Sequence, residues 1–254
     1  MKYDIKHAVR NIFFFFRNKF SRKNEDLAFY ILIVIALVVF ILGLNFFVEF
    51  TEQMQGKALT DFDRTITDFV ISFRSPGRNL FFQFITDVGD LYGYLIATFL
   101  VTIFLFYKLR SWKFIFQLLA VIIVSGLSNL ALKEVINRAR PTIEHLVTVE
   151  TLSYPSGHAM SAMSFYGFLI YLAFHIKMSR WLRGFLCVLF LFLILSIGIS
   201  RIYLGVHFPS DVAGGFLAGL IWVAFCIVLF NVIYLLRKRK SSKEPVPVEE
   251  NLEP

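Results

Sequence analysis

The feature that most constrains the fold of this chain is a series of long apolar runs. They lie at 27–48, 91–107, 112–131, 159–176, 184–199 and 212–236. Each is close to the roughly 20 residues that a helix needs to cross a hydrocarbon core about 30 Å thick. Only helices and closed barrels satisfy the backbone inside a bilayer, and barrel strands would be shorter and would alternate apolar with polar residues. The sequence therefore predicts an all-α, polytopic membrane protein with six transmembrane helices.

Composition agrees with a lipid environment, because 57% of the residues are hydrophobic and 31 are Phe. The net charge of +8 does not by itself indicate nucleic-acid binding, since basic residues beside apolar spans usually set membrane orientation. We therefore expect a lipid bilayer around the chain and no nucleic-acid partner. The two cysteines, Cys187 and Cys226, lie inside apolar runs, which indicates neither a disulfide framework nor a cysteine metal site.

Basic residues mark one side of the predicted membrane domain. Lys and Arg gather before residue 24, near 108–113, near 177–183 and after residue 236. The positive-inside rule makes that side cytoplasmic and places both termini there. We expect a cytoplasmic N-terminal segment at 1–26, a membrane domain at 27–236 and a disordered cytoplasmic tail at 237–254.

The segment 49–90, on the opposite side, is too long for a simple turn. Five of its apolar residues recur at helical spacing, which predicts an amphipathic helix on the outer interface. They are Phe62, Ile66, Phe69, Val70 and Phe73. The pattern leaves open whether this helix has a packing role or handles substrate.

Three polar clusters fall on that same outer side. Their sequences are KEVINRARP at 133–141, PSGH at 155–158 and SRIYLGVHFPSD at 200–211. Each alone has a structural explanation, such as a snorkelling cation, a turn or a helix cap. Together they supply three cations, two histidines, a carboxylate and a small-residue turn, which suits phosphoryl chemistry.

The cations and the turn are candidates for phosphate binding. Lys133, Arg140 and Arg201 could surround the nonbridging oxygens of a phosphate group. Ser156 and Gly157 open the predicted fourth helix, where backbone N–H groups and the helix dipole favour an anion.

The histidines are candidates for the chemistry itself. Asp211 follows His207 by four residues and could hold its ring if Pro209 opens the last helix. The other ring nitrogen of His207 could then attack phosphorus. His158 remains to protonate the leaving oxygen and later to activate water.

These three motifs resemble the signature of the type 2 phosphatidic acid phosphatase superfamily. Lys133 precedes Arg140-Pro141, Pro155-Ser156-Gly157-His158 is intact, and Ser200-Arg201, His207 and Asp211 keep the family order. The resemblance implies a phosphohistidine nucleophile at His207, oriented by Asp211, with His158 as general acid. It implies a phosphate pocket of Lys133, Arg140, Ser156, Gly157, His158 and Arg201, and it implies neither a metal nor another cofactor.

Six spans favour a lipid phosphatase whose substrate reaches the site from the outer leaflet. Compact bacterial members resemble phosphatidylglycerophosphatase B and undecaprenyl pyrophosphate phosphatases, which suggests a bacterial inner membrane. Nothing in the sequence separates phosphatidylglycerol phosphate, phosphatidic acid and undecaprenyl pyrophosphate. The alternatives are a non-catalytic lipid-phosphate-binding protein and an anionic lipid transporter. Glu134 and Arg138 are candidates for headgroup selection, His145 is expected on the surface, and protein partners are left open.

Overall fold

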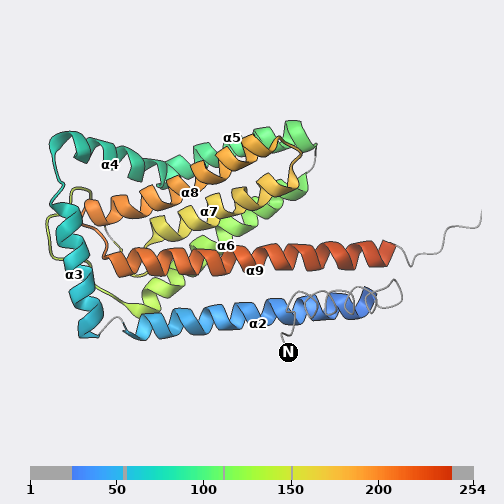
Figure 1. The fold of residues 1–254 in the computed structure, drawn as a ribbon, viewed down its shortest axis with the longest axis horizontal. Helices are drawn as coiled ribbons and strands as arrows, with labels where there is room; N and C mark the ends of the chain where they lie inside the picture. Colours follow the sequence, from blue (N-terminus) through green and yellow to red (C-terminus); the bar gives the residue numbers. More distant parts are fainter. Residues whose placement is uncertain (1–24, 54–55, 111, 150, 242–254) are drawn as a thin grey trace, which may run out of the picture. The chain divides into compact units, whose positions relative to one another are not determined.

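The computed structural model describes residues 25–53, 56–110, 112–149 and 151–241. These residues form helices and loops, and no strand occurs among them, which confirms the all-α class for this part of the chain. The helices are α2 Glu25–Glu52, α3 Lys57–Ile71, α4 Pro76–Val88, α5 Leu91–Leu109, α6 Trp112–Ile136, α7 Gly157–His175, α8 Arg180–Tyr203 and α9 Pro209–Ser241 (Figure 1). Most of the predicted segment 1–26, and the tail from residue 242 onward, lie outside the described residues.

The chain divides into two compact units. Leu42–Cys226 forms the larger unit, and Met1–Ile41 with Ile227–Pro254 forms the smaller one. Every residue of the candidate site belongs to the larger unit.

Four of the described helices are long and apolar enough to cross a membrane. They are Leu91–Leu109, Trp112–Ile136, Arg180–Tyr203 and the Pro209–Arg237 part of α9. The predicted runs at 27–48 and 159–176 lie in α2 and α7, which are helical but are not among these four. The membrane-protein class therefore stands, while the number of six spans stays a prediction. The α7 helix has buried residues along its length, because it packs against both α6 and α8.

Polar caps and one proline mark the starts of four helices. The Asp90 side chain accepts from the N–H of Leu91 at the start of α5. Ser156 likewise caps α7, and Ser179 caps α8. Pro209 is the first residue of α9, as predicted, where its fixed φ suits the first helical turn. Two of these four starts, those of α7 and α9, carry residues of the candidate site.

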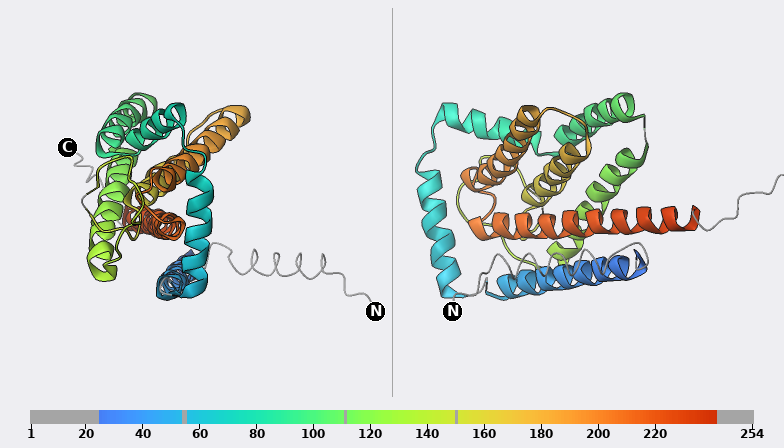
Figure 2. Two further views of the ribbon diagram at one scale, coloured as in Figure 1. Left: turned by 90° about the vertical axis from the view of Figure 1, so that its left-hand side faces the viewer. Right: turned by 45° about the vertical axis from the view of Figure 1, so that its right-hand side comes forward.

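The amphipathic helix expected within 49–90 is confirmed as α3, which lies across the end of the bundle where α8 ends and α9 begins (Figures 1 and 2). Its large aromatic residues do not form the core, because Phe62 and Phe69 are 49% and 62% exposed. The residues that α3 buries are instead Asp63 and Thr67. The helix therefore turns a polar face inward and an aromatic face outward, as suits a helix that borders lipid.

The α4 helix and the loop after α8 are held together around Tyr203. Its ring stacks on Phe82 with the centroids 4.1 Å apart, and its hydroxyl donates to Oδ1 of Asn79 at 2.7 Å. Gly205 follows in a left-handed conformation with φ of 81°, where a Cβ would approach the carbonyl oxygen of Glu144 to 2.6 Å. This turn requires glycine, and it leads the chain directly into His207.

Candidate active site

The three polar motifs meet at one end of the helix bundle. The C-terminal ends of α6 and α8 lie there beside the N-terminal ends of α7 and α9 (Figure 1). Hydrogen bonds tie the motifs together: the N–H of Ser156 donates to the carbonyl oxygen of Asp211 at 3.0 Å. Nη1 of Arg140 lies 3.3 Å from Nε2 of His207. The fold thus brings the first, second and third motifs into one site, as their positions on the same predicted face required.

The His207 ring has a different neighbour at each nitrogen. Its Nδ1 lies 3.5 Å from Oδ2 of Asp211 and 3.4 Å from Oγ of Ser153. The Ser153 hydroxyl also donates to Oδ2 of Asp211 at 2.5 Å, so it bridges the carboxylate and the ring. The distance of 3.5 Å between Asp211 and His207 is long for a direct hydrogen bond. Asp211 therefore orients the ring partly through Ser153, and Nε2 is left facing Arg140.

Asp211 is fully buried and receives donors on both of its oxygens. Oδ2 accepts the N–H of Phe208 at 2.8 Å as well as the Ser153 hydroxyl. Oδ1 accepts Nη1 of Arg138 at 2.6 Å. Nη2 of Arg138 contacts Oδ2 of Asp63 in α3 at 2.8 Å. Arg138, considered above for headgroup selection, thus directs its guanidinium inward to two buried carboxylates.

Lys133 and Arg140 are fixed by the loop that precedes α7. Nζ of Lys133 donates to Oγ1 of Thr151 at 2.8 Å and to the carbonyl oxygen of Leu152 at 2.9 Å. Nε of Arg140 donates to the carbonyl oxygen of Thr151 at 2.6 Å. The guanidinium also donates to the carbonyl oxygen of Val206, beside His207. One loop therefore holds two of the three predicted phosphate-binding cations.

The third cation is held by α4. Nη1 of Arg201 donates to Oγ1 of Thr86 at 2.6 Å. Its Nε is buried and has no hydrogen-bond partner among the described residues, and the same holds for Nε2 of His158. The Nε2 atom of His158 lies 3.8 Å from Oδ1 of Asp90, beyond hydrogen-bonding distance. Buried polar groups without a partner are costly, so both atoms indicate where a polar ligand would bind.

Ser156 and Gly157 form the turn into α7. The Ser156 hydroxyl accepts from the N–H of Ala159, so it acts as the N-cap of the helix. A Cβ on Gly157 would lie 3.0 Å from Oδ1 of Asn129, whose Nδ2 donates to the carbonyl oxygen of Pro155. Glycine at this position therefore lets the turn pack against Asn129 of α6.

Burial lowers the pKa values of the two loop residues closest to the predicted chemistry. It lowers the pKa of His207 to about 4, although the nearby Asp211 carboxylate opposes this shift. Burial also lowers the pKa of Arg140, again opposed by Asp211. His207 is thus a neutral imidazole near pH 7, the form in which a ring nitrogen has a free lone pair.

Comparison with known proteins identifies the family. A model of the PAP2 superfamily matches residues 114–234, which include all three motifs. The chain is also 33% identical over 184 residues to phosphatidylglycerophosphatase B of Bacillus subtilis (strain 168), covering 69% of this chain and 87% of that protein. The chain belongs to the PAP2 superfamily. It is a PAP2-type membrane phosphatase by descent, as its motifs predicted.

Two solved structures share the fold. The crystal structure of a transmembrane PAP2 type phosphatidylglycerolphosphate phosphatase from Bacillus subtilis matches with a TM-score of 0.67 and 26% identity, over 81% of this chain and 97% of that one. Aquifex aeolicus LpxE matches with a TM-score of 0.53 and 25% identity, over 65% of this chain and 93% of that one.

A further sequence relative matches over a shorter stretch. The bacitracin transport permease protein BcrC of Bacillus licheniformis is 42% identical over 86 residues, which span 34% of this chain and 37% of that protein.

Other predicted features of the PAP2 chain have separate outcomes. Cys187 and Cys226 are both free thiols. His145 is exposed, as expected, and its Nε2 lies 2.9 Å from the carbonyl oxygen of Pro141. Among the described residues no group of three or more His, Cys, Asp or Glu side chains is arranged to hold a metal ion.

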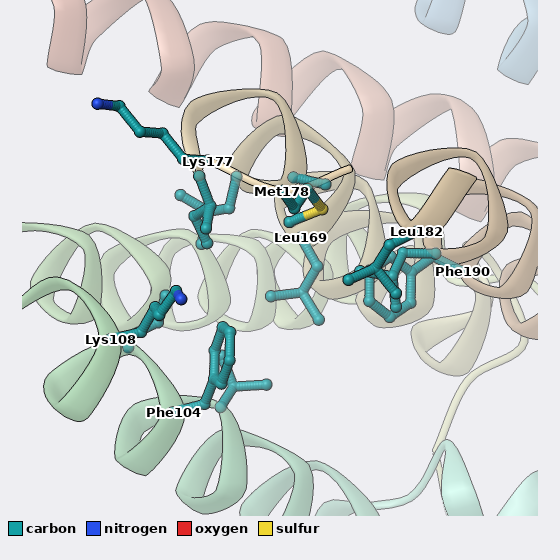
Figure 3. Close-up of a pocket in the computed structure, with 13 residues that line it drawn as sticks. Phe104, Lys108, Leu169, Lys177, Met178, Leu182 and Phe190 are labelled. Carbon is teal, nitrogen blue, oxygen red and sulfur yellow. The ribbon is translucent and has the colours of Figure 1, made fainter. Parts of the chain in front are cut away.

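An apolar pocket lies between α5, α7 and α8, with a volume of about 540 Å³. Figure 3 shows its apolar lining, including Phe104, Leu169 and Phe190, with Lys108 and Lys177 as its charged members. It contacts the C-terminal half of α7, whereas Ser156, Gly157 and His158 stand at the N-terminal end. This pocket is therefore separate from the polar site.

Sequence reasoning missed several residues that support the site, among them Asp63, Thr86, Thr151 and Ser153. Asp63 and Thr86 belong to the segment 49–90, whose role the sequence left open. Asp63 hydrogen-bonds Ser210 across 147 positions of sequence, so no local spacing could have linked the two. A weaker signal did exist, because an acidic residue in a helix on the same face as three cations is a candidate partner for them.

Proposed function

We propose that this PAP2 phosphatase hydrolyses a phosphate monoester or diphosphate of a membrane lipid through a phosphohistidine intermediate. The observation that carries the proposal is the placement of His207. One ring nitrogen is held from Ser153 and Asp211, and the other faces Arg140. A neutral, oriented imidazole beside a cation is the arrangement that nucleophilic attack on phosphorus requires.

The proposed reaction has two steps. Nε2 of His207 attacks phosphorus, the bond from phosphorus to the leaving oxygen breaks, and His158 gives that oxygen a proton. Water then attacks the phosphohistidine with His158 as base, which releases phosphate and restores His207. Asp211 stabilises the positive charge that the ring carries between the two steps.

Lys133, Arg140 and Arg201 are proposed to bind the nonbridging oxygens, together with the turn at Ser156 and Gly157. Nε of Arg201 and Nε2 of His158 are buried without partners among the described residues, so phosphate oxygens would satisfy both. Three side-chain cations supply the charge that Mg²⁺ provides in many phosphoryl-transfer sites, and we therefore propose a metal-independent reaction without other cofactors.

The substrate and the location follow from the membrane setting and the relatives. The B. subtilis relatives are named for phosphatidylglycerol phosphate, so this lipid is the first candidate, ahead of phosphatidic acid and undecaprenyl pyrophosphate. We propose a bacterial cell membrane, with both termini cytoplasmic and the site at the extracytoplasmic interface. The cytoplasmic assignment of 1–26 and 237–254 belongs to the same proposal.

The experiment is phosphate release by the detergent-solubilised protein in the presence of EDTA, with the three lipids compared in parallel. We expect turnover under chelation, and acid-labile, base-stable labelling by radioactive substrate that disappears in His207→Ala. Phosphate binding without release would favour a non-catalytic binding protein, and lipid movement without release would favour a transporter. Activity that EDTA abolishes and a divalent ion restores would contradict the assignment of the three cations.

A further inference from the structure

Two buried carboxylates from distant parts of the chain share one guanidinium. Arg138 donates through Nη1 to Oδ1 of Asp211 at 2.6 Å and through Nη2 to Oδ2 of Asp63 at 2.8 Å. Asp63 is 1% exposed and Asp211 is fully buried. A buried carboxylate is tolerated only when it is paired and hydrogen-bonded, and Arg138 provides this pairing for both.

Asp63 is itself fixed to the start of α9. Its Oδ1 accepts the N–H of Ser210 at 2.8 Å and its Oδ2 accepts the Ser210 hydroxyl at 2.5 Å. Arg138 also contacts this turn, because Nη1 donates to Oγ of Ser210 and the guanidinium lies 4.5 Å from the centroid of the Phe208 ring. The α3 helix therefore holds both the guanidinium and the turn that carries Asp211.

The arrangement sets the orientation of the Asp211 carboxylate. Phe208 and Ser153 occupy Oδ2, and Arg138 occupies Oδ1, so the carboxylate plane is held from both sides. It also sets the local charge. Asp63 shares the guanidinium of Arg138 with Asp211, so Arg138 is not paired with Asp211 alone, and Asp211 can stabilise His207 when the ring becomes cationic.

We infer that Asp63 and Arg138 are positioning residues for the phosphohistidine reaction, an inference that rests on the proposed function. Arg138 locks the Asp211 carboxylate toward the ring, and Asp63 keeps Arg138 from pairing with Asp211 alone. Without Asp63, Nη2 of Arg138 would lose its carboxylate partner, and the guanidinium that fixes Oδ1 of Asp211 would no longer be held in place. Through Asp63, the α3 helix becomes part of the catalytic apparatus.

The first test is Asp63→Asn, which keeps the shape of the side chain and removes its charge. We expect kcat to fall about 10- to 100-fold, as is typical when a partner of a reacting group is lost, with KM unchanged within a factor of about 2. The matched control is Asp68→Asn, the same change on the same helix at an exposed side chain that pairs with Arg64. Equal kcat values in the Asp63 and Asp68 variants would overturn the inference.

The second test asks whether Asp63 acts through Asp211. In an Asp211→Asn background, Asp63→Asn should cost less than about 2-fold in residual kcat, because the charge it helps to orient is already absent. If Asp63→Asn lowers kcat in the Asp211→Asn background by as much as it does in the wild type, Asp63 acts independently of Asp211, and the inference is overturned.

Folding and the proposed function are checked separately. If Asp63→Asn yields no folded protein, Arg138→Lys replaces it, since an ammonium keeps the charge but cannot bridge both carboxylates. The expected result is again lower kcat with KM and the orthovanadate inhibition constant unchanged, and a wild-type kcat would contradict the inference. Failure of the proposed function has a different signature, because phosphohistidine labelling would then be absent from the wild-type protein itself.

Discussion

Arg201 donates from Nη1 to Oγ1 of Thr86 at 2.6 Å, which makes α4 the support of one predicted phosphate-binding cation. Thr86→Val keeps the shape of the side chain and removes the acceptor. A hydrogen bond to a charged group contributes about 1.5–3 kcal/mol, so KM and the orthovanadate inhibition constant should each rise about 10-fold or more. Steady-state kinetics with a soluble phosphate ester measures both.

Thr67→Val is the control for this change. Thr67 is also a buried threonine of the 49–90 segment, and its Oγ1 has no hydrogen-bond partner among the described residues. Its replacement should leave both constants unchanged. Equal effects in the two variants would indicate a general packing response instead of a role for Thr86 in holding Arg201.

Ser153 bridges Asp211 and His207, and its hydroxyl is predicted to matter for rate more than for binding. In Ser153→Ala the 3.5 Å separation of Asp211 and His207 remains without the intervening hydroxyl. We expect kcat to fall about 10-fold with little change in KM, measured as slower phosphoenzyme formation after rapid mixing. Ser164→Ala is the control, because Ser164 is equally buried but bonds Ser125 in α6. An unaltered rate in Ser153→Ala would mean that Asp211 orients the ring alone.

The pKa of His207 predicts how stability changes with pH. Burial lowers the pKa of His207 in the folded protein to about 4, whereas its pKa in the unfolded chain is near 6.5. As the pH falls, the unfolded chain therefore binds the proton first. The free energy of unfolding should be unaffected by this group above pH 6.5 and should decrease by about 3 kcal/mol between pH 6.5 and pH 4.

Thermal unfolding in detergent at several pH values measures this effect. His207→Gln removes the titrating group, so its unfolding temperature should fall less than that of the wild type between pH 6.5 and 4. Parallel curves for the two proteins would show that His207 does not carry the predicted shift.

His158 is predicted to protonate the leaving oxygen. The loss of turnover when His158 is replaced should therefore depend on how readily the leaving group departs without a proton. A nitrophenolate leaves readily without a proton, whereas a lipid alkoxide does not. In His158→Ala the ratio of lipid-phosphate to nitrophenyl-phosphate turnover should therefore fall. The comparison variant is His207→Ala, which should lose both activities together. Labelled phosphoenzyme that persists in His207→Ala and vanishes in His158→Ala would reverse the two roles.

Sequence reasoning could reach the candidate site where its residues lie in compact motifs. Each motif keeps its residues within a short stretch of sequence at the end or start of a helix, as with Lys133 near the end of α6 and Asp211 near the start of α9. The positions of the apolar runs then placed these motifs at one end of the bundle.

The supporting residues could not be predicted in this way. Asp63 and Thr86 lie in α3 and α4, and their partners Arg138 and Arg201 are far away in the sequence. The local sequence pattern of these two helices therefore does not indicate the contacts. The aromatic residues of α3 did predict a helix, but in a membrane the apolar face turns outward and the inward face is polar. The α3 residue that supports the site, Asp63, therefore lies between the apolar residues whose spacing predicted the helix.

Because α3 has a polar inward face and an aromatic outward face, a rotation about its axis would change which side chains face Arg138. An α-helix turns by about 100° for each residue, so one residue inserted after Arg64 would rotate everything before it relative to Thr67 and Val70. Arg64 would then occupy the inward position of Asp63 and bring a second cation against Arg138. A one-residue insertion far from the three motifs would thereby place like charges where a carboxylate now stands, while the composition of the helix stayed almost the same.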